Sequence, residues 1–142
     1  MRERASPLVA TLLAPLLVAA CGVNLGPRGL FNGLVGTWDW VEATGGIASM
    51  TITPTSTGET LELTFTSMAE LEVVRNDSLE QVVDFSVGPV LGGQFPDRSL
   101  EITYHEQVFG FDTQVATFPN DSTLVLTDPC CDGFAYTFVR VP

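Results

Sequence analysis

Two adjacent cysteines, Cys130 and Cys131, carry the most reactive side chains in this sequence. Neighbouring thiols can form a disulfide, bind a soft metal ion such as Cu(I), or exchange with another thiol. The Cα atoms of trans-linked neighbours lie about 3.8 Å apart, below the usual span of about 4.4–6.8 Å across a disulfide, so this bond is strained and readily reduced. The sequence leaves three states open: a vicinal disulfide, unpaired or intermolecular thiols, and a soft-metal site. Pro129 and Asp132-Gly133 place the pair in a hairpin loop, where we expect it to stiffen the loop rather than catalyse a redox reaction.

His105 is the only histidine, and its surroundings in the sequence do not favour catalysis. It follows the apolar Tyr104 at the end of an alternating segment, so we expect its ring to face water. A metal centre needs several convergent ligands, and no spaced set of histidine, cysteine and carboxylate accompanies His105. A catalytic nucleophile needs a base beside it, and the sequence places no serine or cysteine next to this histidine. We therefore expect no enzyme, no bound metal and no cofactor.

The third cysteine, Cys21, ends an apolar segment that covers residues 8–20. Arg2 and Arg4 precede the segment, and small residues stand directly before the cysteine. A basic start, an apolar core of about 7–15 residues and a small-residue cleavage point describe a secretory signal. The segment is shorter than the roughly 20 residues that span a bilayer as a helix. We therefore expect residues 1–20 to be a signal peptide that is removed on export.

The charge of the chain excludes one class of partner. Six arginines and no lysine stand against 17 acidic residues, which gives a formal net charge of −11. Nucleic acids bind to a basic surface, and this sequence contains no basic stripe. We therefore expect no nucleic-acid partner.

Composition divides the exported chain into two parts. Residues 21–33 contain four glycines and a proline, which is typical of a flexible tether. Residues 34–142 have the length of one small domain with a single core.

Apolar and polar residues alternate along most of this domain, as in Leu61-Glu62-Leu63-Thr64-Phe65. Strict alternation indicates antiparallel strands with one buried face and one wet face. Turn residues interrupt the pattern about every ten residues, which indicates a β-sandwich or barrel, and the short turns favour an up-and-down order. The expected strands are 35–43, 47–53, 59–67, 69–75, 79–87, 98–105, 108–118 and a hairpin pair within 123–140.

The segment Val18-Ala19-Ala20-Cys21 resembles the lipobox of bacterial lipoproteins. The resemblance implies that the Cys21 thiol receives a diacylglyceryl group, that the chain is cut before Cys21, and that the new amino end is acylated. Two or more acyl chains hold a protein firmly at a membrane. The next residue is Gly22 rather than aspartate, which in the sorting rule of Gram-negative lipoproteins implies an outer-membrane anchor, with the domain facing the periplasm. An ordinary secretory signal that ends near a cysteine is the alternative interpretation.

Gly36-Thr37-Trp38 opens the first expected strand, and Arg140 ends the last one. Together they resemble the lipocalin-like pattern, in which a Gly-x-Trp motif begins the barrel and a late arginine packs over the tryptophan. The chain is therefore similar to small lipocalin-like lipoproteins of bacterial envelopes. The resemblance implies an all-β fold, a small eight-stranded antiparallel up-and-down barrel, which Trp38 and Arg140 close.

An eight-stranded barrel is just wide enough to hold one small ligand or to be filled by its own side chains. We expect aromatic residues on the inward phase of the strands to line the interior, and the candidate ligand-binding residues are Trp40, Phe65, Phe85, Tyr104 and Tyr136. An open interior predicts non-catalytic binding of a small hydrophobic ligand. A filled interior predicts instead a structural or interaction module whose loops meet another envelope protein.

Overall fold

The computed structural model describes residues 27–130 and 132–142. Strands dominate this part of the chain, with one helix before the first strand and a second, single-turn helix after the second strand. The elements are α1 (Pro27–Leu34), β1 (Gly36–Gly45), β2 (Met50–Ile52), α2 (Pro54–Thr57), β3 (Leu61–Phe65), β4 (Glu70–Arg75), β5 (Ser78–Gly88), β6 (Ser99–Val108), β7 (Phe111–Asn120), β8 (Thr123–Thr127) and β9 (Phe134–Arg140).

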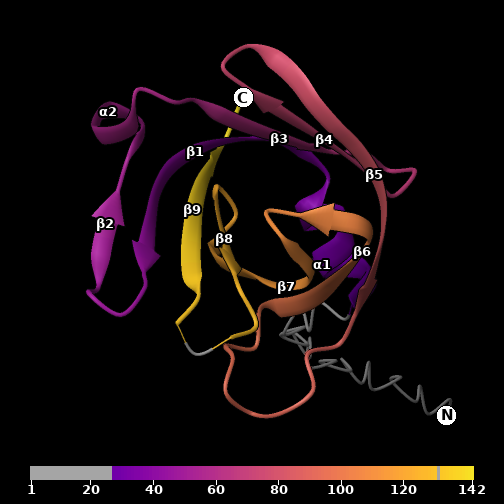
Figure 1. Ribbon diagram of the computed structural model, residues 1–142. Helices are drawn as coiled ribbons and strands as arrows, with labels where there is room; N and C mark the ends of the chain where they lie inside the picture. The colour runs from indigo at the N-terminus through magenta and orange to yellow at the C-terminus, as the bar shows by residue number, and fades with distance from the viewer. Residues whose placement is uncertain (1–26, 131) are drawn as a thin grey trace, which may run out of the picture.

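Eight of these strands form a closed antiparallel barrel. β1 and β3 to β9 pair in sequence order, and the ring closes where β9 pairs with β1 (Figure 1). Closure removes the exposed edges that an open sheet would leave. The predicted all-β, eight-stranded up-and-down barrel is confirmed, and it is compatible with a lipocalin-like fold.

The segment expected as a strand over residues 47–53 lies outside this barrel. Only Met50–Ile52 is extended, and it pairs with the end of β1 alone. The reason is that β3 occupies the same edge of β1 nearer its start, where Gly36 pairs with Phe65 and Asp39 with Glu62. Figure 1 shows β2 and α2 beside the ring of strands.

The alternating pattern becomes the inside and outside of the barrel. In β3, Leu61, Leu63 and Phe65 are buried, whereas Glu62 and Thr64 lie on the other face. The same alternation holds in β8. The inward side chains of all the barrel strands meet in one hydrophobic core.

Helix α1 forms where we expected the second half of a flexible tether. Leu30 and Leu34 are buried in the core, and the Phe31 ring lies 6.2 Å from the Phe85 ring. The glycines suggested flexibility, but these apolar residues share one face of the helix, and packing that face against the barrel stabilises it. We call the end of the barrel that α1 covers the base, and the opposite end, where β3 begins and β4 ends, the mouth.

Arg140 joins the first and last strands at the base. Its guanidinium carbon lies 4.1 Å from the centre of the Trp38 ring, the contact that the family resemblance implied. Its three nitrogens donate to backbone carbonyls: Nη1 to Val35 (3.0 Å), Nε to Asp121 (3.2 Å), and Nη2 to Gly33. Each nitrogen of the half-buried guanidinium therefore has an acceptor, which offsets the cost of taking the charge partly out of water.

Gly36 makes this arrangement sterically feasible. Its φ of +139° lies in a region that residues with a side chain rarely adopt, and a Cβ atom there would stand 2.5 Å from Arg140 Nη1. The Gly-x-Trp motif therefore requires glycine at this position, because the Arg140 guanidinium occupies the space that a side chain would fill.

Candidate functional site at the barrel mouth

The centre of the barrel is filled by side chains. Three of the five predicted ligand-binding residues, Phe65, Phe85 and Tyr104, are almost fully buried in the core. The Phe65 and Phe85 rings meet edge to face with their centres 5.4 Å apart, a favourable aromatic geometry. These three side chains line none of the cavities described below, so they act as core residues.

The other two predicted residues, Trp40 and Tyr136, line a cleft at the mouth. The cleft has a volume of about 290 Å³, just below the range of about 300–1,000 Å³ for small-molecule sites. Its apolar wall combines five side chains from β1, β2, β3, β9 and the turn between β6 and β7: Trp40, Ile52, Leu61, Phe109 and Tyr136. We call this space the mouth cleft.

Phe109 is a cleft residue that sequence reasoning missed. It forms a two-residue turn with Gly110 between β6 and β7, and both residues have positive φ (53° and 83°). This is the pattern of a type I′ turn, in which Asn-Gly is the favoured pair and a phenylalanine is strained. The Phe109 ring stacks on Tyr136 with 5.4 Å between the ring centres. The turn thus holds the Phe109 ring over the mouth, although the positive φ of this residue strains its backbone.

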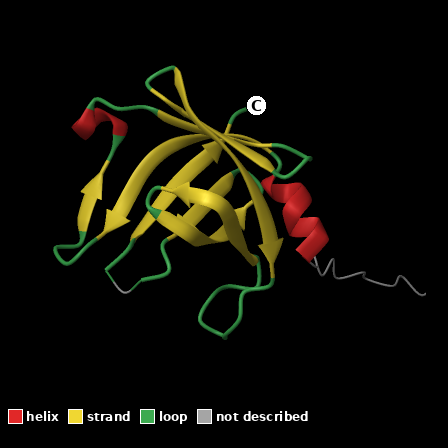
Figure 2. Ribbon diagram, turned by 45° about the vertical axis from the view of Figure 1, so that its right-hand side comes forward, coloured by secondary structure: helices red, strands yellow, loops and turns green. Residues whose placement is uncertain are grey.

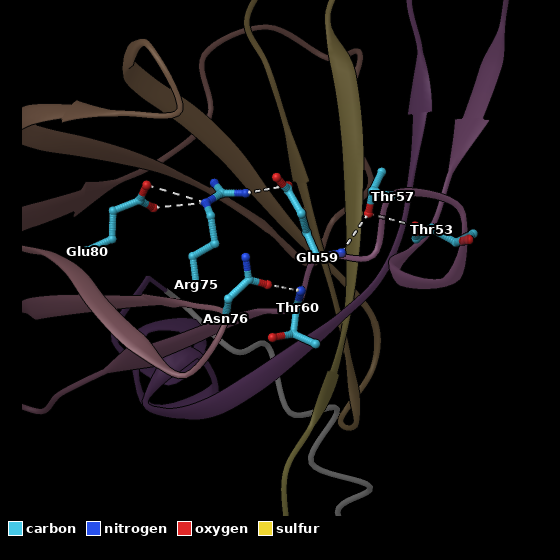
Figure 3. A network of polar contacts seen from close by, with 7 residues as sticks. All are labelled: Thr53, Thr57, Glu59, Thr60, Arg75, Asn76 and Glu80. Atoms are coloured by element: carbon cyan, nitrogen blue, oxygen red, sulfur yellow. Dashed lines mark hydrogen bonds and ion pairs between the residues drawn. The ribbon is translucent and has the colours of Figure 1, made fainter.

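Arg75 supplies the polar side of the mouth cleft. Its Nη1 donates to Glu59 (3.0 Å) and its Nε to Glu80 (3.2 Å), so two carboxylates flank one guanidinium (Figure 3). All three side chains are partly exposed, and ion pairs of this kind add little stability. Their effect is to fix Arg75 in place and to leave the rim with an excess of negative charge. Thr57 contributes to the same wall, and its Oγ1 accepts a hydrogen bond from the Glu59 amide (3.2 Å).

A buried chain of hydrogen bonds runs near this end of the barrel. The Tyr104 hydroxyl donates to Gln114 Oε1 (2.9 Å), and Gln114 Nε2 donates to Asp128 Oδ1 (2.7 Å). Asp128 Oδ2 accepts from the amide of Phe134 (3.0 Å). Gln114 and Asp128 are buried, so each hydrogen bond offsets the loss of water contacts. Sequence reasoning missed this chain, because its members come from separate strands and loops.

Two tyrosines near Asp128 have raised pKa values. Burial, and then the negative charge of Asp128, raise the pKa of Tyr104 above its usual value of 10.0. The same causes in the same order raise the pKa of Tyr136, and the positive charge of Arg75 opposes them. Both phenols therefore stay neutral near pH 7 and present hydroxyl groups rather than charge.

The indole nitrogen of Trp40 is a second unusual polar group. Trp40 is more than nine-tenths buried, and no atom of the described residues accepts a hydrogen bond from its Nε1. It lies where β1 changes partner, since Asp39 is the last β1 residue paired with β3 and Ala43 the first paired with β2. Beside this gap is a groove of about 340 Å³, which shares Trp40 and Leu61 with the mouth cleft. A buried donor without an acceptor is costly. Because this N–H is shielded from solvent, a ligand acceptor would reach it only if the neighbouring side chains moved apart.

The cysteine predictions fall partly outside the described residues. Cys21 and Cys131 are not described, so lipidation and the vicinal disulfide stay predictions. Cys130 is exposed in the loop between β8 and β9 and forms no disulfide with any residue that the structure describes. His105 is exposed, as its phase in the strand indicated.

Two further findings concern membranes and metals. Neither α1 nor α2, the helices in the described part of the chain, has the length and apolar character needed to cross a membrane. Across residues 27–130 and 132–142, no three histidine, cysteine or acidic side chains gather in a way that would hold a metal ion.

Fold and site together define a small closed eight-stranded antiparallel barrel with a filled centre and an aromatic cleft at its mouth. Comparison of the chain with family models, with curated proteins and with solved structures gives no match.

Proposed function

We propose that the protein is a lipid-anchored envelope lipoprotein that binds a small, flat, neutral molecule in the mouth cleft, without catalysing a reaction. The observation that carries the proposal is the cleft of about 290 Å³, whose wall includes the aromatic side chains of Trp40, Phe109 and Tyr136. The sequence predicts a ligand inside the barrel. We propose a site at the mouth instead, because core side chains fill the centre.

The shape of the cleft favours a ring-bearing ligand. The stacked pair Phe109 and Tyr136 offers a flat aromatic surface, and Trp40 lines the same space. Aromatic pairs prefer offset-stacked or edge-to-face contact, which a planar ligand can extend. A volume near 290 Å³ fits a molecule of one or two rings and is too small for a long acyl chain together with its headgroup.

The charges of the cleft select against anions. Arg75 is shared between Glu59 and Glu80, so the three groups together carry one negative charge. The whole chain has a formal charge of −11, which repels anionic ligands at a distance. A ligand that displaces the side chains shielding Trp40 Nε1 would gain from a carbonyl or ring-nitrogen acceptor.

The ligand proposal is tested with a neutral acyl-naphthalene dye, a planar fluorophore whose ketone accepts a hydrogen bond. We expect the protein to bind the dye with a blue-shifted emission. Trp40→Phe keeps a ring and removes the N–H, and we expect affinity to fall about tenfold, the value of one hydrogen bond of roughly 1.4 kcal/mol. Native mass spectrometry of protein purified from bacterial envelopes then shows whether a cellular molecule is bound, and loss of that molecule from Phe109→Asn would assign it to the mouth cleft.

Phe109→Asn is the sharper variant, because it removes the ring while supplying the residue that the type I′ turn prefers. We expect dye affinity to fall at least tenfold with an unchanged or higher urea midpoint. Phe95→Asn, an aromatic removal in the loop between β5 and β6, is the matched control and should bind like the parent. Equal affinity for the parent and Phe109→Asn, or no dye binding at all, contradicts the proposal.

The anchor is supported by the sequence of residues 1–22 and needs its own test. Cells fed an alkyne-bearing fatty acid should incorporate it into the full chain. Cys21→Ser should abolish incorporation and leave the unprocessed precursor. Labelling that persists in Cys21→Ser contradicts lipidation at this residue.

The filled centre also favours the second function that the sequence left open, an interaction module for another envelope protein. Ile47 and Met50, in the β1–β2 hairpin, are largely exposed apolar residues beside the mouth, and they could pack against such a partner. This function is favoured if the parent protein binds no dye and carries no small molecule.

A further inference from the structure

The loop between β5 and β6 is an apolar surface at the base of the barrel. No charged residue occurs between Asp84 and Asp97, and the loop tip carries Leu91 with 88% of its surface exposed and Phe95 with 37%. Figure 2 shows this loop projecting from the barrel on the side of α1, away from α2. Exposed apolar side chains on an uncharged, projecting loop are typical of a contact surface.

The loop lies on the same side of the barrel as α1 and faces it across a cavity. Leu30 of α1 lines this cavity of about 440 Å³ together with Val90, Phe95 and Leu100. The loop and the helix that begins at Pro27 are therefore neighbours at the base.

The length of chain before α1 restricts what can lie near this loop. Cys21 precedes Pro27 by six positions, and six residues reach at most about 20 Å when fully extended. A lipid on Cys21 would therefore hold the start of α1 within about 20 Å of the bilayer surface, and the neighbouring loop would lie on the membrane-facing side. The mouth, at the opposite end of the barrel, would not be held there.

Most of the described arginines also lie at the base of the barrel. The described residues include four arginines, and three of them, Arg28, Arg98 and Arg140, lie at the base on or beside α1. The Arg98 guanidinium is paired with Asp121 at 2.6 Å. The fourth, Arg75, lies at the mouth. In a chain this acidic, such a distribution reduces the repulsion between the base and anionic headgroups.

We propose that the β5–β6 loop is a membrane-contacting surface, which places Leu91 and Phe95 among the lipid headgroups and upper acyl chains beside the lipidated Cys21. The proposal rests on the lipid anchor of the proposed function and not on the ligand. Lipid provides the bulk of the attachment, and the loop fixes the orientation of the barrel. The mouth cleft then opens away from the membrane, toward the aqueous phase.

The test uses the full lipidated chain in phosphatidylcholine vesicles whose acyl chains carry bromine, which quenches tryptophan at short range. Leu91→Trp places a reporter at the loop tip. Ile47→Trp is the matched control, because Ile47 is an equally exposed apolar residue (92%) in the β1–β2 hairpin beside the mouth. Trp38 and Trp40 contribute the same background to both variants. Mass spectrometry confirms the lipid on each protein before reconstitution.

We expect quenching of the added emission to be severalfold stronger for Leu91→Trp than for Ile47→Trp. Equal or absent quenching in lipidated protein overturns the loop contact and leaves the anchor standing. A chain that carries no lipid overturns the anchor, and this inference with it. Dye binding at the mouth is measured separately and is affected by neither outcome.

Discussion

Gly36→Ala is the substitution whose effect the structure defines most sharply. It adds one methyl group at a position where φ is +139° and where that methyl would stand 2.5 Å from Arg140 Nη1. Two separate costs follow, one from the backbone and one from the displaced guanidinium. A matched control exists in Gly33→Ala, because Gly33 lies in α1 without a positive φ and has open space where a Cβ atom would stand.

The two costs can be estimated separately. Holding a residue with a side chain in a sparsely populated φ region costs roughly 1–3 kcal/mol. Displacing the guanidinium weakens its cation–π contact with Trp38, worth about 0.5–2 kcal/mol, and its bond to the Val35 carbonyl, worth about 1.5–3 kcal/mol. We expect a total loss of about 3–5 kcal/mol, a large share of the stability of a small domain. Gly33→Ala should instead stabilise the protein by about 0.5–1 kcal/mol.

Urea unfolding followed by tryptophan fluorescence measures these losses as changes in midpoint at constant slope. The decisive step is to repeat Gly36→Ala in an Arg140→Met background, where the guanidinium is gone and only the backbone cost remains. We expect the loss there to fall to roughly 1–3 kcal/mol, which corresponds to a coupling of about 2 kcal/mol between the two positions.

An equal loss in both backgrounds would show that the guanidinium does not need the space at Gly36. A loss below about 0.5 kcal/mol in the parent, similar to that of an ordinary surface substitution, would refute the backbone geometry as well.

Three further outcomes are expected, each with its own measurement. Asp128→Ala leaves the Gln114 amide without its acceptor and should lower the free energy of unfolding by about 2–4 kcal/mol in urea titrations, and a loss under about 1 kcal/mol would contradict a tightly bonded chain. Because folding raises the pKa of Tyr104 above 10.0, its phenol ionises first in the unfolded state, so the contribution of this group to stability should be constant below about pH 10 and decline above it. Tyr104→Phe should reduce this decline, and a parent whose stability is flat in alkaline urea titrations would refute the assignment. A vicinal disulfide, one of the three states that the sequence leaves open for Cys130 and Cys131, should block alkylation until a reductant is added, and uptake of two alkyl groups by unreduced, unfolded protein would exclude it.

The barrel was predictable because its signal is local. Each strand carries its own alternation, as Leu61, Leu63 and Phe65 do in β3, and short turns leave few ways to order such strands. The contact between Trp38 and Arg140 came from a family pattern, and the structure adds its reason in the space beside Gly36.

Features that depend on tertiary packing were not predictable. Helix α1 looked like a tether because Gly29 and Gly33 lower helix propensity, and only the barrel base gives its apolar face a partner. The inward phase of a strand does not tell a cleft residue from a core residue, so Phe85 and Tyr136 looked alike in sequence. Phe109 was missed because a phenylalanine in a Gly-containing turn has no sequence signature of a ligand site.

The pairing of β1 with β9 has a consequence for how the chain is made. Arg140 bonds to carbonyls that precede it by 105 and 107 residues, and β9 follows the other described strands in the chain. Contacts of such long sequence separation slow folding, so β1 keeps an unpaired edge until β9 has been made. A chain truncated before β9 would leave that edge open to aggregation or proteolysis, so closure of the barrel protects β1 only after β9 has joined it.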